Sequence, residues 1–119
     1  MDKLGEKKPY DLEERTFVFA KRTNQYVNAL PRTISNLENG KQLVRSGGSV
    51  GANYIEANEA LSKKDFAMRV KISRKEAKES FFWLKLSEPS AAQQNEKEWL
   101  MNEANELMKI FSAIMRKSE

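Results

Sequence analysis

Apolar residues recur at alternating steps of three and four along nearly the whole chain. That spacing is the period of amphipathic helices, and it differs from the strict alternation of half-buried strands. The three prolines divide the pattern: Pro9 precedes the first periodic segment, Pro31 separates the first from the second, and Pro89 separates the third from the fourth. Because proline interrupts helices, the chain is predicted to be all-α, an antiparallel up-down four-helix bundle with short connections.

The predicted helices cover about residues 11–30, 33–61 and 64–86, and a fourth begins near Asn95. Ser62 with Asp65, and Asn95 with Glu98, have the three-residue spacing of capping motifs at helix starts. A chain of 119 residues can bury one hydrophobic core but not two. We therefore expect a flexible tail at residues 1–10 and a single domain at residues 11–119.

Four stripes of mostly apolar residues are expected to form the core. The first two are Leu12, Thr16, Phe19, Thr23, Tyr26 and Leu30, widened by Phe17, and Gly40, Leu43, Gly47, Val50, Tyr54, Ala57 and Leu61. The third and fourth are Phe66, Val70, Ser73, Ala77, Phe81 and Leu84, and Leu100, Ala104, Leu107, Phe111 and Ile114.

The second stripe crosses three glycines, Gly47, Gly48 and Gly51. A loop is the alternative, because each glycine inside a helix costs roughly 1 kcal/mol relative to alanine. The stripe nevertheless stays in phase across the glycines, which favours an uninterrupted helix with a neighbour packed closely on it. If the chain folds back near Lys63, the facing rings are those of Phe81, Phe82 or Trp83. Neither phosphate-binding glycine motif, GxxxxGK[ST] or GxGxxG, is present, so packing is favoured over nucleotide binding.

Composition narrows the chemistry. The chain has no cysteine and no histidine, which excludes disulfides, thiolate metal sites and the commonest general base. We expect no metal, no cofactor and no catalysis. No apolar run approaches the roughly 20 residues of a membrane span, and residues 1–15 lack the apolar segment of a signal peptide. A cytoplasmic location is therefore predicted.

Polar residues in the second and third helices are predicted to fix their register. The fold-back brings Arg45 near the level of Glu79, and we expect these two side chains to pair. Asn53 and Glu56, three residues apart, are expected to join the same polar layer. The carboxylates Glu56 and Glu79 are the only candidates for catalytic acids, and the structural interpretation is favoured.

The basic residues concentrate on the third helix. Residues 63–85 contain eight basic and three acidic residues, a net charge of +5 against +4 for the whole chain. Lys64, Lys71, Lys78 and Lys85 repeat every seven residues, with Lys75 between them and Arg74 alongside. This row is about 32 Å long, enough to follow several phosphates. An ordinary solvated face is the alternative for a lone helix, whereas a symmetric oligomer would multiply the row.

Two stretches carry a resemblance to a known family. Leu30-Pro-Arg-Thr-Ile-Ser-Asn with Gly40-Lys-Gln-Leu-Val-Arg-Ser-Gly-Gly-Ser-Val-Gly-Ala-Asn-Tyr-Ile-Glu-Ala, and Arg74-Lys-Glu-Ala-Lys-Glu-Ser-Phe-Phe-Trp-Leu, resemble the bacterial four-helix-bundle protein family. That family includes proteins encoded by intervening sequences within large-subunit ribosomal RNA genes, and it is similar to the accessory variability determinant of diversity-generating retroelements. The matching positions are Arg45, Ser46, Gly47, Gly51, Asn53, Glu56, Glu76, Glu79 and Trp83.

The resemblance implies a ring-like homopentamer and, for the retroelement relatives, a basic surface for nucleic acid and a reverse transcriptase as partner. Together with the basic row, it favours a non-catalytic oligomer that binds RNA regardless of sequence. The alternative is a protein-interaction scaffold with no nucleic-acid role, for which an exposed Phe82, Trp99 or Tyr10 would be the indicator. Relatives more often carry one polar residue at positions 81 and 82, so the extra phenylalanine either deepens the core or stays exposed for a partner.

Overall fold

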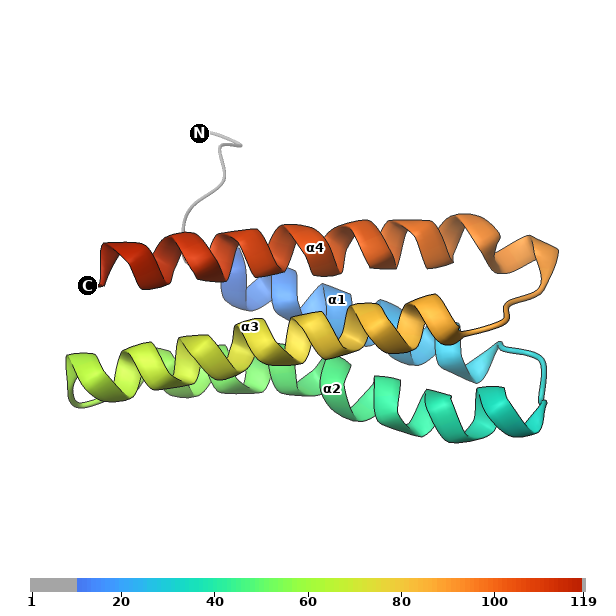
Figure 1. The fold of residues 1–119 in the computed structure, drawn as a ribbon, viewed down its shortest axis with the longest axis horizontal. Coiled ribbons are helices and arrows are strands. Elements are labelled where there is room, and N and C mark those ends of the chain that lie inside the picture. The colour runs from blue at the N-terminus through green and yellow to red at the C-terminus, as the bar shows by residue number, and fades with distance from the viewer. Residues whose placement is uncertain (1–10, 119) are drawn as a thin grey trace.

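The computed structural model describes residues 11–118 as four helices. They are α1 (Asp11–Asn28), α2 (Ile34–Asn58), α3 (Lys63–Leu86) and α4 (Gln94–Lys117), with a single 3-10 turn, η1 (Ala91–Gln93), leading into α4. The α1–α2 and α3–α4 connections lie at one end of the molecule, and the α2–α3 turn lies at the other, beside the C-terminus (Figure 1). The predicted all-α, up-down arrangement is confirmed. The predicted tail at residues 1–10, with Tyr10, lies outside the described residues.

Each helix buries most of the stripe that its periodicity predicts. The side chains that are almost completely buried include Phe19, Tyr26, Leu43, Val50, Val70, Leu84, Leu100, Leu107 and Phe111. Burying one such side chain stabilises the fold by about 1.5–3 kcal/mol, so this common core holds the four helices together. None of the helices within residues 11–118 is long and apolar enough to cross a membrane.

Two residues assigned to the stripes lie outside the core. Phe17 is 60% exposed, because at this level it is the preceding residue, Thr16, that lies against Gly51 of α2. Leu61 is 98% exposed, because α2 ends at Asn58 and the chain is already turning. The predictions for these two residues are wrong.

The glycine-bearing helix α2 is uninterrupted, as predicted, but its close neighbour is α1 rather than the aromatic rings of α3. A Cβ atom on Gly51 would lie 2.7 Å from Oγ1 of Thr16, and one on Gly47 would lie 3.1 Å from Cγ2 of Thr23. A Cβ atom on Gly40 would lie 2.9 Å from Cγ1 of Val27. These glycines therefore let α1 approach α2 closely. Gly48 differs, since its added Cβ would meet nothing within 4 Å.

Small polar side chains fill the interface between α2 and α3. The hydroxyls of Ser46 and Ser80 lie 2.8 Å apart, and Ser73 donates a 2.9 Å hydrogen bond to the carbonyl oxygen of Val50. All three serines are buried. Since buried hydroxyls with partners cost little and occupy little volume, they allow a close approach of α3 to α2 without leaving unsatisfied groups there.

Capping residues set most of the helix starts. Thr33 accepts a hydrogen bond from the backbone N–H of Asn36, and Ser62 accepts one from the backbone N–H of Asp65, as predicted for Ser62. The fourth helix begins at Gln94, one residue from the predicted start near Asn95, but Asn95 lies inside the helix and is not its N-cap. The side chain of Gln93 instead accepts a hydrogen bond from the backbone N–H of Ser90, and η1 brings α4 forward to Gln94.

Asn36 joins the two connections at one end of the bundle. Its side-chain amide donates to the carbonyl oxygens of Pro31 and Glu88, both at 2.9 Å, and its carbonyl oxygen accepts from the N–H of Glu88 at 3.0 Å. The Asn36 side chain is buried, and both its amide nitrogen and its carbonyl oxygen have hydrogen-bond partners. The sequence pattern gives no sign of this role, because Asn36 belongs to no stripe.

Two arginines of α1 form ion pairs with glutamates of α4. Arg15 forms a bidentate pair with Glu103, and Arg22 forms one with Glu96. In each case the hydrogen bonds to the carboxylate raise the pKa of the guanidinium. The Arg22 guanidinium also lies 3.5 Å above the ring of Trp99, which is half-buried. Of the aromatic residues named as indicators for the scaffold hypothesis, Phe82 is exposed at 53% and Trp99 is not exposed.

Candidate nucleic-acid interface

Six basic residues of α3 form a continuous surface row on the outside of the bundle. We call Lys64, Lys71, Arg74, Lys75, Lys78 and Lys85 the basic row. Its five lysines are exposed, and Arg74 is half-buried at the side that meets α4. The row is exposed because the opposite side of α3, from Val70 to Leu84, is packed into the core.

Few contacts neutralise this row within residues 11–118. Lys75 lies 3.7 Å from a carboxylate oxygen of Glu76, a loose and solvated ion pair of small energy. Arg74 donates a long hydrogen bond of 3.4 Å to Oγ of Ser112. The four lysines spaced by seven residues form no ion pair with any other described residue. Within residues 11–118, these four ammoniums face solvent without a carboxylate partner.

A shallow groove runs between the basic row and α4. It has a volume of about 580 Å³ and is lined by Lys71, Ile72, Arg74, Lys75, Lys78, Met108 and Ser112. Basic groups stand on the α3 side, and the thioether of Met108 and the hydroxyl of Ser112 stand on the α4 side. Such a surface can follow a phosphate backbone, but it offers few groups that could distinguish one base from another.

Lys97 of α4 extends the positive charge past the end of α3, and the sequence analysis missed it. Its ammonium donates to the carbonyl oxygens of Lys85 at 3.3 Å and Ser87 at 2.9 Å. A cation at this position stabilises the negative end of the α3 dipole and orders the α3–α4 connection. The sequence did not indicate this role of Lys97, because Lys97 reaches Lys85 only after the chain turns back between α3 and α4.

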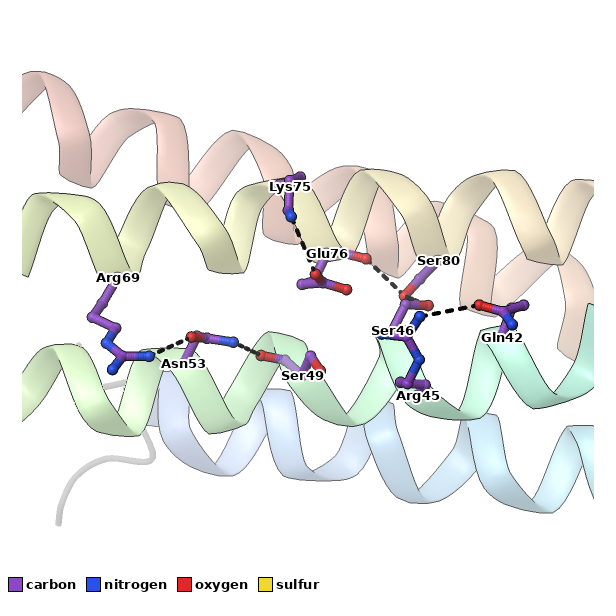
Figure 2. Close-up of polar contacts among 9 residues, drawn as sticks. All are labelled: Gln42, Arg45, Ser46, Ser49, Asn53, Arg69, Lys75, Glu76 and Ser80. Atoms are coloured by element: carbon purple, nitrogen blue, oxygen red, sulfur yellow. Dashed lines mark hydrogen bonds and ion pairs between the residues drawn. The ribbon is translucent and has the colours of Figure 1, made fainter.

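The polar groups between α2 and α3 form a separate set of contacts on the neighbouring side (Figure 2). Arg69 donates to Oδ1 of Asn53 at 3.0 Å, and the Asn53 amide donates to the carbonyl oxygen of Ser49 at 2.9 Å. Asn53 thus links α2 to α3 through Arg69, and not through the predicted layer with Glu56, Arg45 and Glu79.

Comparison with known proteins places the chain in a family. The family model described as 23S rRNA-intervening sequence protein matches residues 9–113. The chain belongs to the 23S rRNA-intervening sequence protein family. A solved structure from Bacteroides thetaiotaomicron VPI-5482, described as a protein of unknown function from the S23 ribosomal protein family, is 31% identical in sequence. The two superpose with a TM-score of 0.71, over 87% of this chain and 97% of that chain. No curated protein matches the chain.

In this member of the 23S rRNA-intervening sequence protein family, the predicted pair of Arg45 with Glu79 does not form. Arg45 instead donates to the side-chain oxygen of Gln42 at 3.3 Å, one turn earlier on α2 (Figure 2). Glu79 and Glu56 are both exposed, so neither belongs to a buried polar layer. The reason is rotational: the three–four stripe gives the level of each residue along its helix but not its angle relative to the neighbouring helix.

Trp83 and the glycines complete the set of predicted assembly residues. Trp83 is half-buried and packs against the core, as a structural residue would. Gly47 and Gly51 contact α1, whereas Gly48 contacts nothing within the chain. Among residues 11–118, no group of three or more acidic, histidine or cysteine side chains converges as a metal site would require.

Proposed function

We propose that this protein is a non-catalytic RNA-binding protein that holds the phosphate backbone on the basic row of α3. The observation that carries this proposal is the arrangement of Lys64, Lys71, Lys78 and Lys85. These four lysines are exposed on one face, seven residues apart, with no ion pair inside residues 11–118. Like charges at this spacing repel one another weakly, and a polyanion relieves that repulsion.

Binding without sequence preference follows from the type of contact. Lysine ammoniums are point charges that attract phosphates, and base-reading usually needs planar side chains in a defined groove. RNA is chosen as the ligand on the sequence resemblance and the exposed lysines, since the family description, 23S rRNA-intervening sequence protein, says where such proteins are encoded and not what they bind. A role as an accessory to a reverse transcriptase, which the sequence resemblance implies, belongs to the same proposal, since such a partner would act on the bound strand.

A binding role also agrees with the state of the acidic residues. Glu56 and Glu79, the two acids considered for catalysis, are exposed on α2 and α3. A catalytic carboxylate usually gains its altered reactivity from burial in a cleft. Neither residue lines the groove between the basic row and α4.

The test is the dependence of RNA affinity on salt. Each neutralised phosphate of a single strand contributes roughly −0.7 to the slope of log affinity against log salt concentration. With four to six contacts, a slope of about −3 to −4 is expected from fluorescence anisotropy titrations at several potassium chloride concentrations. A slope near zero, or no RNA binding at low salt, would contradict the proposal.

The second part of the proposal is self-association through α1 and α2. Leu37, Val44 and Ile55 of α2 are exposed apolar residues spaced by seven and eleven, and therefore lie on one face with Gly48. Phe17 follows Thr16, which lies against Gly51, so its exposed ring is at the same level. A second copy of the chain is the proposed occupant, and the open Gly48 leaves space for its side chains. A ring-like pentamer would repeat the basic row five times.

Two charged substitutions test this assembly. Val44→Glu with Ile55→Glu should reduce the mass measured by light scattering from a multiple of the chain mass to 13.7 kDa, because glutamates cannot be desolvated in an apolar contact. Leu61→Glu changes an equally apolar residue in the α2–α3 turn, and should leave the mass unchanged. A parent protein of 13.7 kDa at all concentrations would refute self-association.

A further inference from the structure

Phe82 is an exposed aromatic side chain inside the basic row. Its side chain is 53% exposed, although the residues on either side of it, Phe81 and Trp83, pack against the core. It lies four residues after Lys78 and three before Lys85, and is therefore on the same face of α3 as both. An outward position on an amphipathic helix is normally polar, so an aromatic ring there is available to a partner outside the chain.

The Phe82 ring contacts a second aromatic ring of α3. It contacts the ring of Trp83 with centroids 5.0 Å apart and planes at 75°, the edge-to-face arrangement that aromatic pairs prefer. Trp83 is partly buried and packs against the core, so one side of the Phe82 ring has a neighbour within the chain. The exposed ring lies near two cations, Lys78 and Lys85, and one acid, Glu79, and an aromatic face beside cations is a platform on which a nucleobase can stack.

The surrounding charge identifies the kind of ligand. Lys78 and Lys85 are about 10 Å apart along the helix, with Phe82 between them. Apolar protein surfaces would have to desolvate both ammoniums to reach the ring, whereas a nucleic-acid strand carries a phosphate for each ammonium and a base for the ring. In a duplex the faces of the bases are covered by their neighbours, so only unpaired nucleotides can stack on a protein side chain.

We propose that the basic row binds unpaired nucleotides, with one base stacked on Phe82 and the flanking phosphates held by Lys78 and Lys85. This inference rests on the proposed function and narrows it to single-stranded RNA. Without stacking on Phe82, the basic row would still attract phosphates, but it would not prefer single strands to duplexes.

The experiment compares Phe82→Leu with the parent protein on two probes, a short oligouridylate and the same strand paired with oligoadenylate. Leucine keeps an apolar side chain of similar reach but has no π face. We expect affinity for the oligouridylate, measured by fluorescence anisotropy of the labelled strand, to fall about tenfold, within the range for the loss of one stacked base. Affinity for the duplex should stay the same. Phe82→Trp keeps an aromatic face, so it should bind the single strand as tightly as the parent.

Three outcomes would overturn the inference. In the first, Phe82→Leu binds the oligouridylate as tightly as the parent. In the second, the parent binds the duplex more tightly than the single strand. In both cases, a steep dependence of affinity on salt would still support the proposed function. Phe82→Leu could instead lower the mass measured by light scattering, which would assign the ring to a protein contact. If the parent protein bound neither the single strand nor the duplex, the proposed function itself would be rejected. Circular dichroism of the variant checks that α3 remains folded.

Discussion

Replacing Lys71, Lys75 and Lys78 together with glutamate is expected to weaken RNA binding by about a hundredfold or more. The three residues line the groove between α3 and α4 and form the middle of the basic row. Each change removes a phosphate contact and adds a repulsive charge, so the loss exceeds that of neutral substitutions. All three side chains are exposed, so the fold should be unaffected. Anisotropy titration at one low salt concentration measures the effect.

A second triple variant separates the basic row from net charge. Lys21, Lys41 and Lys109 lie exposed on α1, α2 and α4, and changing them to glutamate alters the charge of the protein by the same amount. Lys41 and Lys109 lose only loose surface ion pairs. This variant should bind RNA within a few-fold of the parent. Equal losses in both variants would mean that overall charge drives binding, and parental affinity in the first would exclude α3 as the contact.

The basic row was predictable from the sequence because its geometry depends on α3 alone. A seven-residue repeat of lysines stays on one face of any helix, and the apolar stripe of α3 required that face to point outward. The contacts of Lys97 with Lys85 and of Arg74 with Ser112 were not predictable, since each joins α3 to α4. Such contacts depend on how two helices are rotated about their axes, which residue spacing does not specify.

In the fold, too, features that depend on a single helix could be predicted, whereas contacts between two helices could not. The core residues of all four helices followed from periodicity, and the continuity of α2 followed from the unbroken phase of its stripe. The partner of Gly47 did not, because residues on one stripe can turn toward either neighbouring helix. The expected contact of Gly47 with rings of α3 was inferred only from their similar height along the bundle. The observed contact is with Thr23 of α1, and it is equally compatible with the position of Gly47 on the apolar stripe of α2.

Gly51→Leu is expected to destabilise the protein by about 3 kcal/mol, or more if the helices cannot separate. A Cβ atom at this position would lie 2.7 Å from Oγ1 of Thr16 and 3.0 Å from its Cβ, and the Thr16 side chain is itself buried with little freedom to move. The helix-propensity gain of roughly 1 kcal/mol on removing glycine is too small to offset this overlap. The melting temperature should fall by about 10 °C or more, measured by circular dichroism at 222 nm.

Gly48→Leu is the matched control for that substitution, because it places the same side chain three residues earlier on the same helix. The added Cβ would meet nothing within 4 Å in its own chain. Both leucine variants are therefore compared in the Val44→Glu, Ile55→Glu background, where the proposed contact between copies is removed, and there Gly48→Leu should melt at or slightly above the temperature of that background. If both variants melted like that background, α1 would not be packed against Gly51. If both were destabilised alike, the cost would arise from α2 itself rather than from its contact with α1. Only a loss confined to Gly51→Leu supports a bundle in which the missing side chain of one glycine admits the threonine of the neighbouring helix.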